Sequence, residues 1–273
     1  MALPRSGLVL ATLLTALATS GVAAAQSVPR AFCADRPGKG SPPCVLDQGR
    51  FQVEVGLADA AFSRGGGTTV DATSFGALEL RLGLTASLEG QLSWTARQRI
   101  RTVDRASGAA ETVSGAGDLG LAVRWSLRHP DGDGLSIALQ PFIVAPTGSD
   151  GIGGGQWQGG VIAPVSIPLT DDWSLALSPQ VAVRPNASGS GRHAGLSLTG
   201  GLGRSIGPFA LGAELWVDVD DDPVDRVTAA SFDLTASWAT KTLPDMQFDA
   251  SAYLGLNSAT PDLELVVGVA RRF

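Results

Sequence analysis

The chain has 273 residues, of which 44% are hydrophobic, 17% are charged and 35 are glycine. Its net charge of −6, with 20 basic and 26 acidic residues, argues against a nucleic-acid-binding surface. After residue 25 no apolar run approaches the roughly 20 residues of a membrane-spanning helix, so the alternating apolar sequence leaves a sandwich, a solenoid or a closed barrel.

Residues 1–25 have the features of a secretory signal peptide. Arg5 precedes an apolar stretch over residues 7–17, and Ala23, Ala24 and Ala25 form a small-residue cleavage site. The mature chain is therefore expected to begin near Gln26. No cysteine follows the apolar stretch in a lipoprotein arrangement, so no lipid anchor is expected.

Residues 26–49 are expected to form a periplasmic arm closed by a disulfide. Cys33 and Cys44 are the only cysteines, and in an oxidising compartment two such thiols are expected to pair. The sequence between them is rich in proline and glycine. A staple on an extended arm is the simpler interpretation, and a small plug or a partner-docking element is the alternative. Two thiols are too few for a metal site.

From residue 50 onward the apolar residues recur with a period of two, as in strands that have one apolar face. The clearest case begins at Leu119, where odd-numbered positions up to Leu127 are apolar and Arg124 lies on the opposite face. The pattern predicts about 12 strands of the length that a tilted membrane strand needs, ~9–11 residues. They are 50–58, 73–83, 87–100, 117–127, 135–145, 157–168, 173–184, 194–204, 208–218, 229–240, 246–256 and 262–273.

The connections between these strands alternate in length. Short turns are expected at 84–86, 128–134, 169–172, 205–207 and 241–245, and long external loops at 59–72, 101–116, 146–156, 185–193 and 219–228. Outer-membrane barrels have this arrangement, whereas a sandwich gives no reason for it. The fold class predicted is an all-β, antiparallel, up-and-down transmembrane β-barrel over residues 50–273, in the outer membrane of a Gram-negative bacterium.

Two sets of side chains support the barrel. If both termini are periplasmic, seven rings fall at one height and form an interfacial aromatic girdle: Phe51, Trp125, Trp173, Phe209, Trp238, Phe248 and Phe273. Alternation sends a charged set into the lumen, since lipid exposure of an arginine at mid-depth would cost ~2–4 kcal/mol. This set is Glu54, Glu79, Arg81, Glu89, Arg97, Asp118, Arg124, Glu214, Asp233, Asp249, Glu264 and Arg272. Opposed charges could fill the lumen, or they could line a narrow wet channel.

Several motifs of catalytic or binding proteins occur without their usual context. Gly115, Gly117 and Gly120 spell G-x-G-x-x-G, but a strand follows where a dinucleotide site needs a helix. Ser205 lies in a G-x-S-x-G pattern that is followed by a proline and another strand, which suits a hairpin turn. His129 and His193 fall in predicted loops. No catalytic residue and no cofactor is therefore expected.

An acidic external loop contains Asp218, Asp220, Asp221, Asp222 and Asp225. Carboxylates at this density could bind Ca²⁺ or bridge divalent ions to lipopolysaccharide phosphates, with Asp220, Asp221 and Asp222 as the candidate ligands. A solvated loop is the alternative.

Three short motifs give the chain a family resemblance. Gly-Ala-Gly-Asp-Leu-Gly-Leu at residue 115, Ala-Pro-Thr-Gly-Ser at 145 and Ala-Thr-Pro-Asp at 259, with Arg-Arg-Phe at the C-terminus, resemble the outer-membrane transporters of the MetA-pathway of phenol degradation family. The resemblance covers roughly residues 50–273. It implies a barrel for the passage of small solutes, including aromatic or hydrophobic compounds, and it supplies no catalytic or binding residues.

The function predicted is passive diffusion of small solutes through a charged lumen, with external loops 59–72, 101–116 and 146–156 narrowing its mouth. The alternatives are a closed structural or interaction barrel and a lipid-modifying enzyme that uses Ser205 or a histidine. The expected partners are the solute, outer-membrane lipid, lipopolysaccharide and, during biogenesis, the barrel-assembly machinery. No nucleic-acid partner is expected.

Overall fold

The computed structural model describes residues 29–240 and 242–273, so the expected signal peptide lies outside the described residues. The secondary structure of the described part consists of strands alone, and it includes no helix that could span a membrane. The strands are β1 (Phe51–Gly65), β2 (Thr68–Gly83), β3 (Leu88–Asp104), β4 (Ala110–Gly115), β5 (Leu119–Arg128), β6 (Ser136–Ala145), β7 (Gln158–Ile162), β8 (Val165–Pro168), β9 (Trp173–Pro185), β10 (Arg192–Ile206), β11 (Phe209–Asp220), β12 (Val227–Thr240), β13 (Leu243–Gly255) and β14 (Leu263–Arg272).

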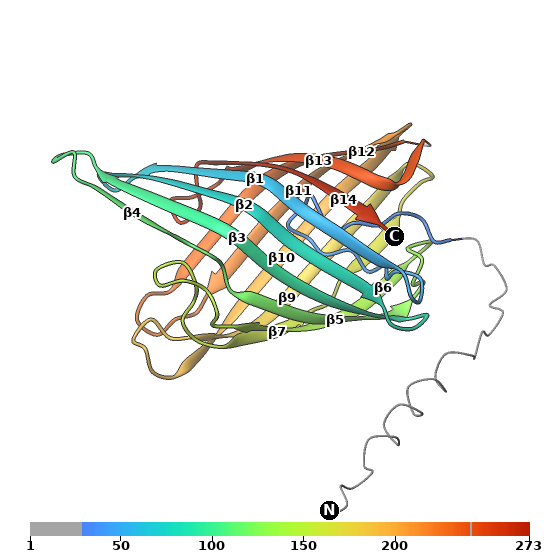
Figure 1. Ribbon diagram of the computed structural model, residues 1–273, viewed down its shortest axis with the longest axis horizontal. Coiled ribbons are helices and arrows are strands. Elements are labelled where there is room, and N and C mark those ends of the chain that lie inside the picture. Colours follow the sequence, from blue (N-terminus) through green and yellow to red (C-terminus); the bar gives the residue numbers. More distant parts are fainter. Residues whose placement is uncertain (1–28, 241) are drawn as a thin grey trace, which may run out of the picture.

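The strands close into a single antiparallel barrel (Figure 1). Strands that are adjacent in sequence pair with each other, except that β4 does not pair with β5 and β7 does not pair with β8. Instead β3 pairs with both β4 and β5, and β6 and β9 each pair with both β7 and β8. β1 closes the ring by pairing with β14. Because β4 and β5 follow one path, as do β7 and β8, the barrel has 12 strands, which confirms the predicted fold class. The ring of strands is closed, as a sheet in lipid requires, while β4 lies off the ring and pairs on one side with β3.

The burial pattern is the reverse of that of a soluble protein. On β5 the odd-numbered apolar side chains are exposed, with Trp125 at 51%, while Arg124 between them is fully buried. The same inversion holds around the barrel: the largest fully buried side chains include Arg81, Gln52, Glu54 and Glu89. Apolar rows face outward to lipid and polar rows face the lumen, as the alternation in the sequence predicts.

The first strands are longer than predicted, and two of the predicted external loops are wrong. Residues 59–72 form the upper parts of β1 and β2, which meet in a tight turn at Gly66 and Gly67, both with positive φ (56° and 82°). Most of residues 101–116 belongs to β3 and β4, which pair with each other. These strands project beyond the rest of the barrel (Figure 1). Only 146–156 is a loop over its whole length.

A one-residue change of phase crosses β1, β2 and β3 at the same height. Below it Gly56, Ala77 and Thr95 lie opposite one another, and above it Asp59 lies opposite Ser74. β1 bulges against β14 after Gly56, whereas the register of β2 with β1 and with β3 is the same on both sides of Gly76, which has a φ of 66°. A bulge of this kind exchanges the inward and outward faces of all residues beyond it.

Arg97 was predicted to line the lumen, and the phase change places it on the outer face instead. Its register partner Phe75 is 53% exposed, and Arg97 itself is exposed, donating a hydrogen bond to the Ser114 hydroxyl at 3.2 Å. Gln98 takes the inward position, since its amide nitrogen and the Thr95 side chain both lie within 3.3 Å of the Cβ position of Gly117. The prediction for Arg97 was wrong because it assumed that inward and outward residues alternate strictly through the phase change.

Candidate functional site

The segment before β1 lies inside the barrel. Residues 29–50 enter at the end that carries the C-terminus, cross the lumen and return to begin β1 (Figure 1). Cys44, Val45 and Leu46 are 4%, 3% and 2% exposed. The sequence predicted a periplasmic arm, with a small plug as the alternative. In the structure residues 29–50 lie inside the barrel, and we call them the plug segment or plug. The physical reason is charge matching, since the segment carries charged groups that pair with the lumen wall.

A disulfide between Cys33 and Cys44 closes the loop that crosses the lumen. The two half-cystines also present their carbonyl oxygens to arginines of the wall. The Cys33 carbonyl accepts from Arg81 Nη1 at 2.8 Å and from Gln52 Nε2 at 3.0 Å, and the Cys44 carbonyl accepts from Arg124 Nη1 at 3.2 Å. The disulfide therefore fixes the spacing of two acceptors that the wall recognises.

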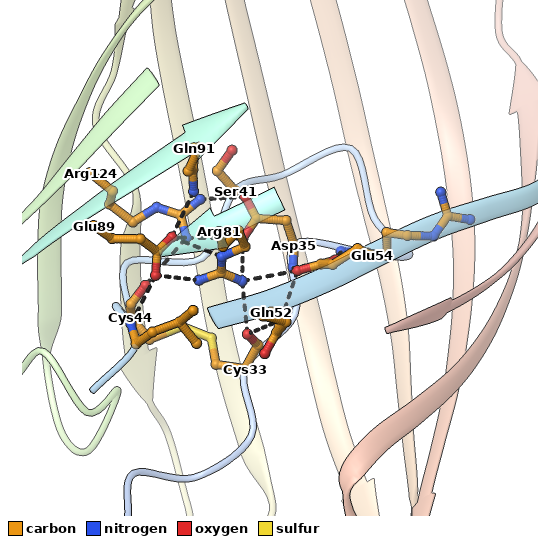
Figure 2. A network of polar contacts seen from close by, with 12 residues as sticks. Cys33, Asp35, Ser41, Cys44, Gln52, Glu54, Arg81, Glu89, Gln91 and Arg124 are labelled. Atoms are coloured by element: carbon orange, nitrogen blue, oxygen red, sulfur yellow. Dashed lines mark hydrogen bonds and ion pairs between the residues drawn. A yellow bond between two sulfur atoms is a disulfide. The ribbon is translucent and has the colours of Figure 1, made fainter. Parts of the chain in front are cut away.

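Asp35 of the segment lies between two fully buried arginines of the wall (Figure 2). Its carboxylate is 2.9 Å from Arg81 Nη1 and 2.9 Å from Arg124 Nη1, and it also accepts from Arg124 Nη2. Burial alone would raise the pKa of Asp35, but the two guanidinium groups of Arg124 and Arg81 outweigh it and hold the pKa below its usual range. The carboxylate is therefore ionised at neutral pH.

Two glutamates of the wall hold the backbone of the segment. Glu54 on β1 accepts from the backbone N–H groups of Asp35 at 3.1 Å and Arg36 at 3.0 Å. Glu89 on β3 accepts from Leu46 N at 2.8 Å and pairs with Arg81 at 2.8 Å. Both glutamates are fully buried. The cluster is thus a closed network of paired charges, in which loss of one partner leaves another charge buried and unpaired.

The Arg36 side chain occupies a niche that two glycines of the wall leave open, apart from the charge cluster around Asp35. Gly56 of β1 and Gly268 of β14 are register partners, and Cβ atoms added to them would lie 2.9 Å and 2.4 Å from the Arg36 guanidinium. The guanidinium group pairs with Asp249 of β13 at 3.2 Å. The glycines therefore leave room in the wall for a side chain of the segment.

Lys39 anchors the far side of the loop. Its ammonium group donates to Ser231 Oγ at 2.7 Å and lies 3.7 Å from Asp233. It also sits 4.4 Å from the ring centroid of Trp216 and 4.5 Å from that of Tyr253, which are cation–π distances. The Lys39 ammonium is thus held by aromatic, hydroxyl and carboxylate groups of β11, β12 and β13.

The segment leaves a cavity on each of two sides. One, of about 320 Å³, lies against β3, β5 and β6, and includes Phe142 and Val144 on its wall. The other, of about 290 Å³, lies against β9 to β12 and has a wall of small residues. Both cavities border Gly38, Gly40 and Ser41 of the segment, and the first cavity also borders Lys39. The wall residues of the second cavity include Ser174, Ala176, Ser178, Thr199, Gly201, Gly203, Ala210, Gly212, Thr235 and Ser237.

Of the other residues predicted to line the lumen, some contact the plug segment and the others lie toward the external end of the barrel. Glu214 accepts from Lys39 N at 3.0 Å, and Arg272 pairs with Asp245 at 2.6 Å and donates to the Arg30 carbonyl at 2.8 Å. Glu79 borders the first cavity and Glu264 a smaller one near the external end. Asp118 accepts from the backbone of loop 146–156, at Gly148 and Gly154, both at 2.7 Å.

Sequence reasoning missed the residues of the segment itself. Asp35, Arg36 and Lys39 stand in a proline- and glycine-rich stretch without periodicity, and their partners are far away in the sequence. Arg184 was also missed; it pairs with Asp218 at 2.6 Å at the external mouth. The available signal was the density of charge in a segment bounded by two cysteines.

The aromatic residues predicted as a girdle all lie on the outer surface. Their exposed fractions range from 38% for Trp238 to 51% for Trp125. Phe51 stacks on Phe273 with ring centroids 4.7 Å apart, and Trp238 lies 5.6 Å from Phe248. These contacts join the first strand to the chain terminus and β12 to β13 at the end that carries the termini.

The other candidate residues are placed in turns and loops. Ser205 is the last residue but one of β10, beside a turn at Gly207, and His129 lies in the turn before β6. His193 contacts Asp220 at the external end, so the structure does not bring Ser205 and His193 together. Gly115 ends β4 and Gly120 lies within β5.

The acidic loop is used for pairing within the protein. Asp221 pairs with Arg226 at 3.2 Å, Asp220 contacts His193, and Asp222 accepts from Ala187 N at 2.7 Å. Within residues 29–240 and 242–273 no group of three metal-ligating side chains is arranged to hold an ion. Among these carboxylates it is that of Asp222 that ties loop 186–191 to loop 221–226, through Ala187 N.

A family model described as "Putative MetA-pathway of phenol degradation" matches residues 34–273, so it includes most of the plug as well as the barrel. No curated protein matches the chain. Among solved structures, an outer membrane channel from Pseudomonas putida F1 is similar, with a TM-score of 0.65 at 17% identity over 87% of this chain and 99% of that one. The translocator domain of the autotransporter NalP from Neisseria meningitidis has a TM-score of 0.52 at 14% identity, over 88% and 90% of the two chains. These likenesses show the fold.

Proposed function

Because the chain belongs to the family of the MetA-pathway of phenol degradation, and because its barrel is closed and inside-out, we propose that it is an outer-membrane channel for passive diffusion of small solutes. The observation that carries the proposal is the pair of cavities that flank the plug. Each lies against the plug segment and the lumen wall, so solutes pass beside the segment.

The solutes that fit best are small, and include aromatic or hydrophobic compounds. The cavities are at or near the lower end of the 300–1,000 Å³ that ligand pockets usually occupy. Their walls combine hydroxyl and amide groups such as Ser93, Gln140 and Ser178 with the apolar side chains of Phe142 and Val144. A phenol-like molecule has one polar group and one apolar ring, which matches a wall of this composition.

The charges of the site favour neutral solutes. Asp35, Arg36 and Lys39 are each matched by opposite charges of the wall, so the narrow region has little free charge. Near the external mouth Asp218 and Asp220 share one arginine, Arg184, so that negative charge is in excess there and disfavours anions. The protein acts without catalysis in this proposal.

The test is reconstitution of the mature wild-type protein. Planar bilayers would measure ion conductance, and liposome swelling would measure the flux of phenol, benzyl alcohol, glucose and benzoate. We expect small conductance, and faster swelling with the neutral aromatic solutes than with glucose or benzoate. Absence of both conductance and swelling would contradict the proposal.

A closed structural barrel is the second candidate, because the charge network around Asp35 and Arg124 joins the segment to the wall at β3, β5 and β6. In that case wild-type protein gives no flux, while a variant with a released plug does. Flux through the wild-type barrel excludes this candidate.

A further inference from the structure

Three arginines form a row on the outer face of the projecting strands. Arg97, Arg99 and Arg101 occupy alternate positions of β3, and all three are exposed, while the residues between them are partly buried. The phase change described above is what turns them outward, because Gln98 takes the inward position. Same-face neighbours on a strand are about 7 Å apart, so the row presents three guanidinium groups over roughly 14 Å.

The row begins where the lipid-facing apolar row ends. Along the outer face of β3, Leu88, Leu92 and Trp94 precede it, and Leu88 lies opposite Trp125 of the aromatic girdle. From Leu88 to Arg97 a strand tilted by about 40° rises roughly 23 Å, close to the ~25 Å apolar band of outer-membrane barrels. The arginines therefore lie at the height of the external lipid headgroups.

Nothing in the described part of the chain neutralises these arginines. Asp71 lies opposite Arg101 in the register, but its carboxylate pairs with Arg64 at 2.8 Å. Arg97 donates to the neutral Ser114 hydroxyl. No ion pair among the described residues includes any of the three, whereas the chain as a whole has a net charge of −6. A positive strip on an acidic protein, at headgroup height, has charge complementarity with anionic lipid.

We propose that Arg97, Arg99 and Arg101 bind the phosphate groups of lipopolysaccharide in the outer leaflet. Guanidinium groups form paired hydrogen bonds with phosphate oxygens, and the apolar row below them is placed to contact the acyl chains of the same molecule. The proposal rests on the barrel's place in the outer membrane and does not depend on whether the lumen conducts.

The test compares two matched triple variants of the mature protein. R97Q/R99Q/R101Q removes the row, and R128Q/R204Q/R271Q removes three exposed arginines near the opposite end of the barrel. Each protein, in detergent, is titrated with lipopolysaccharide, with dephosphorylated lipopolysaccharide and with phosphatidylglycerol, and bound lipid is counted by native mass spectrometry. Retained β-sheet circular dichroism shows that a variant is folded.

We expect the row variant to bind lipopolysaccharide roughly tenfold or more weakly than wild type, since each basic residue near an anionic lipid surface contributes a several-fold change. The opposite-end variant should bind as wild type does, and removal of the phosphates should weaken wild-type binding. If the triple variant does not fold, R99Q alone should show a smaller loss. Equal binding by wild type and the row variants overturns the proposal, as does equal wild-type affinity for phosphatidylglycerol.

Discussion

Arg81 and Arg124 are fully buried, yet each has its charge matched by carboxylates from both the wall and the plug. Breaking a buried pair by removing one partner is commonly destabilising by ~3–5 kcal/mol, because the other charge stays buried. The two arginines therefore couple the position of the plug to the stability of the barrel wall.

We expect Arg124→Ala to release the Asp35 side of the plug. Asp35 would lose one of its two guanidinium partners and Gln140 its donor. Flux through reconstituted protein should rise, and the midpoint of thermal unfolding should fall. Arg204→Ala, which removes an exposed arginine stacked on Trp173, serves as the control and should change neither quantity. Unchanged flux and midpoint in Arg124→Ala would mean that the network does not hold the plug.

Gly268 gives a second prediction at the scale of one residue. A Cβ there would lie 2.4 Å from Arg36 Nε, so Gly268→Val should expel the Arg36 side chain from its niche. Exposure of the plug should follow, measured as faster tryptic cleavage after Lys39. Gly90→Val is the matched control, because its Cβ would meet only the end of the Leu84 side chain at 3.5 Å. Equal protection of Lys39 in both variants would refute the niche.

At the scale of elements, the plug is a short segment without regular secondary structure. The wall holds it at both ends of its one loop, near Cys33 and near Cys44. The disulfide joins Cys33 and Cys44 across an 11-residue separation, and loop closure of this size restricts the unfolded chain by about 3 kcal/mol in the chain-entropy account. The disulfide keeps the carbonyl oxygens of Cys33 and Cys44, together with Asp35, aligned with the arginines of the wall.

We expect Cys33→Ser/Cys44→Ser to loosen the plug while leaving the barrel closed. The barrel strands make their own pairings, so β-sheet circular dichroism should be retained. Cleavage after Lys39 by trypsin should become faster than in wild type, and flux should rise. Protection equal to that of wild type would show that the charge network alone positions the segment.

The loop pair at the external end depends on Asp222. Its carboxylate accepts from the backbone N–H groups of Ala187 and Val224, and these bonds lower the pKa of Asp222 below 3.8. A carboxylate with a depressed folded-state pKa stabilises the fold fully above its unfolded value and loses that contribution as the pH falls through the folded value. The loops should therefore stay paired from neutral pH to about pH 4 and separate in stronger acid.

Asp222→Asn tests this at neutral pH. The variant should expose the loops and speed tryptic cleavage after Arg226 and Arg192, with wild type approaching the same behaviour only below about pH 4 under an acid-active protease. Asp225→Asn, at an exposed position of the same loop, is the control and should cleave as wild type does. A wild-type loop that opens already near pH 6 would show that the Asp222 carboxylate does not hold the pair together.

At the scale of the whole molecule, the barrel and the plug together define where a solute can pass. In the proposed function solutes pass through the cavities beside the segment, so that passage requires no departure of the plug from the lumen. A channel that opens only when the segment leaves is a different mechanism with the same fold.

A covalent link between the segment and the barrel wall would distinguish the two mechanisms. Ser41 N lies 2.9 Å from Ser178 Oγ, so a disulfide formed by Ser41→Cys and Ser178→Cys would fix the segment to β9. We expect the tethered protein to conduct small neutral solutes as wild type does. Flux that is lost on tethering and rises with reductant to the level of reduced wild type would show that the segment must move.

Period-two alternation and the lengths of the connections were enough to predict the strand count, the inside-out distribution and the rings on the outer surface. These features are local, because each residue's face follows from its neighbours two positions away. Most of the charged residues predicted to face inward are therefore found on the lumen side, from Glu54 near the first strand to Arg272 near the last.

The tertiary structure alone decided the projecting strands, the outward turn of Arg97 and the place of the plug. A bulge is a mismatch between paired strands, so one strand read by itself does not reveal it, and the Gly- and Thr-rich pairs of β1 to β4 have the composition of loops. Asp35 and Arg124 are 89 positions apart in the chain. Only closure of the barrel brings the wall arginines around the lumen, and a buried carboxylate is stable there because both guanidinium groups already surround it.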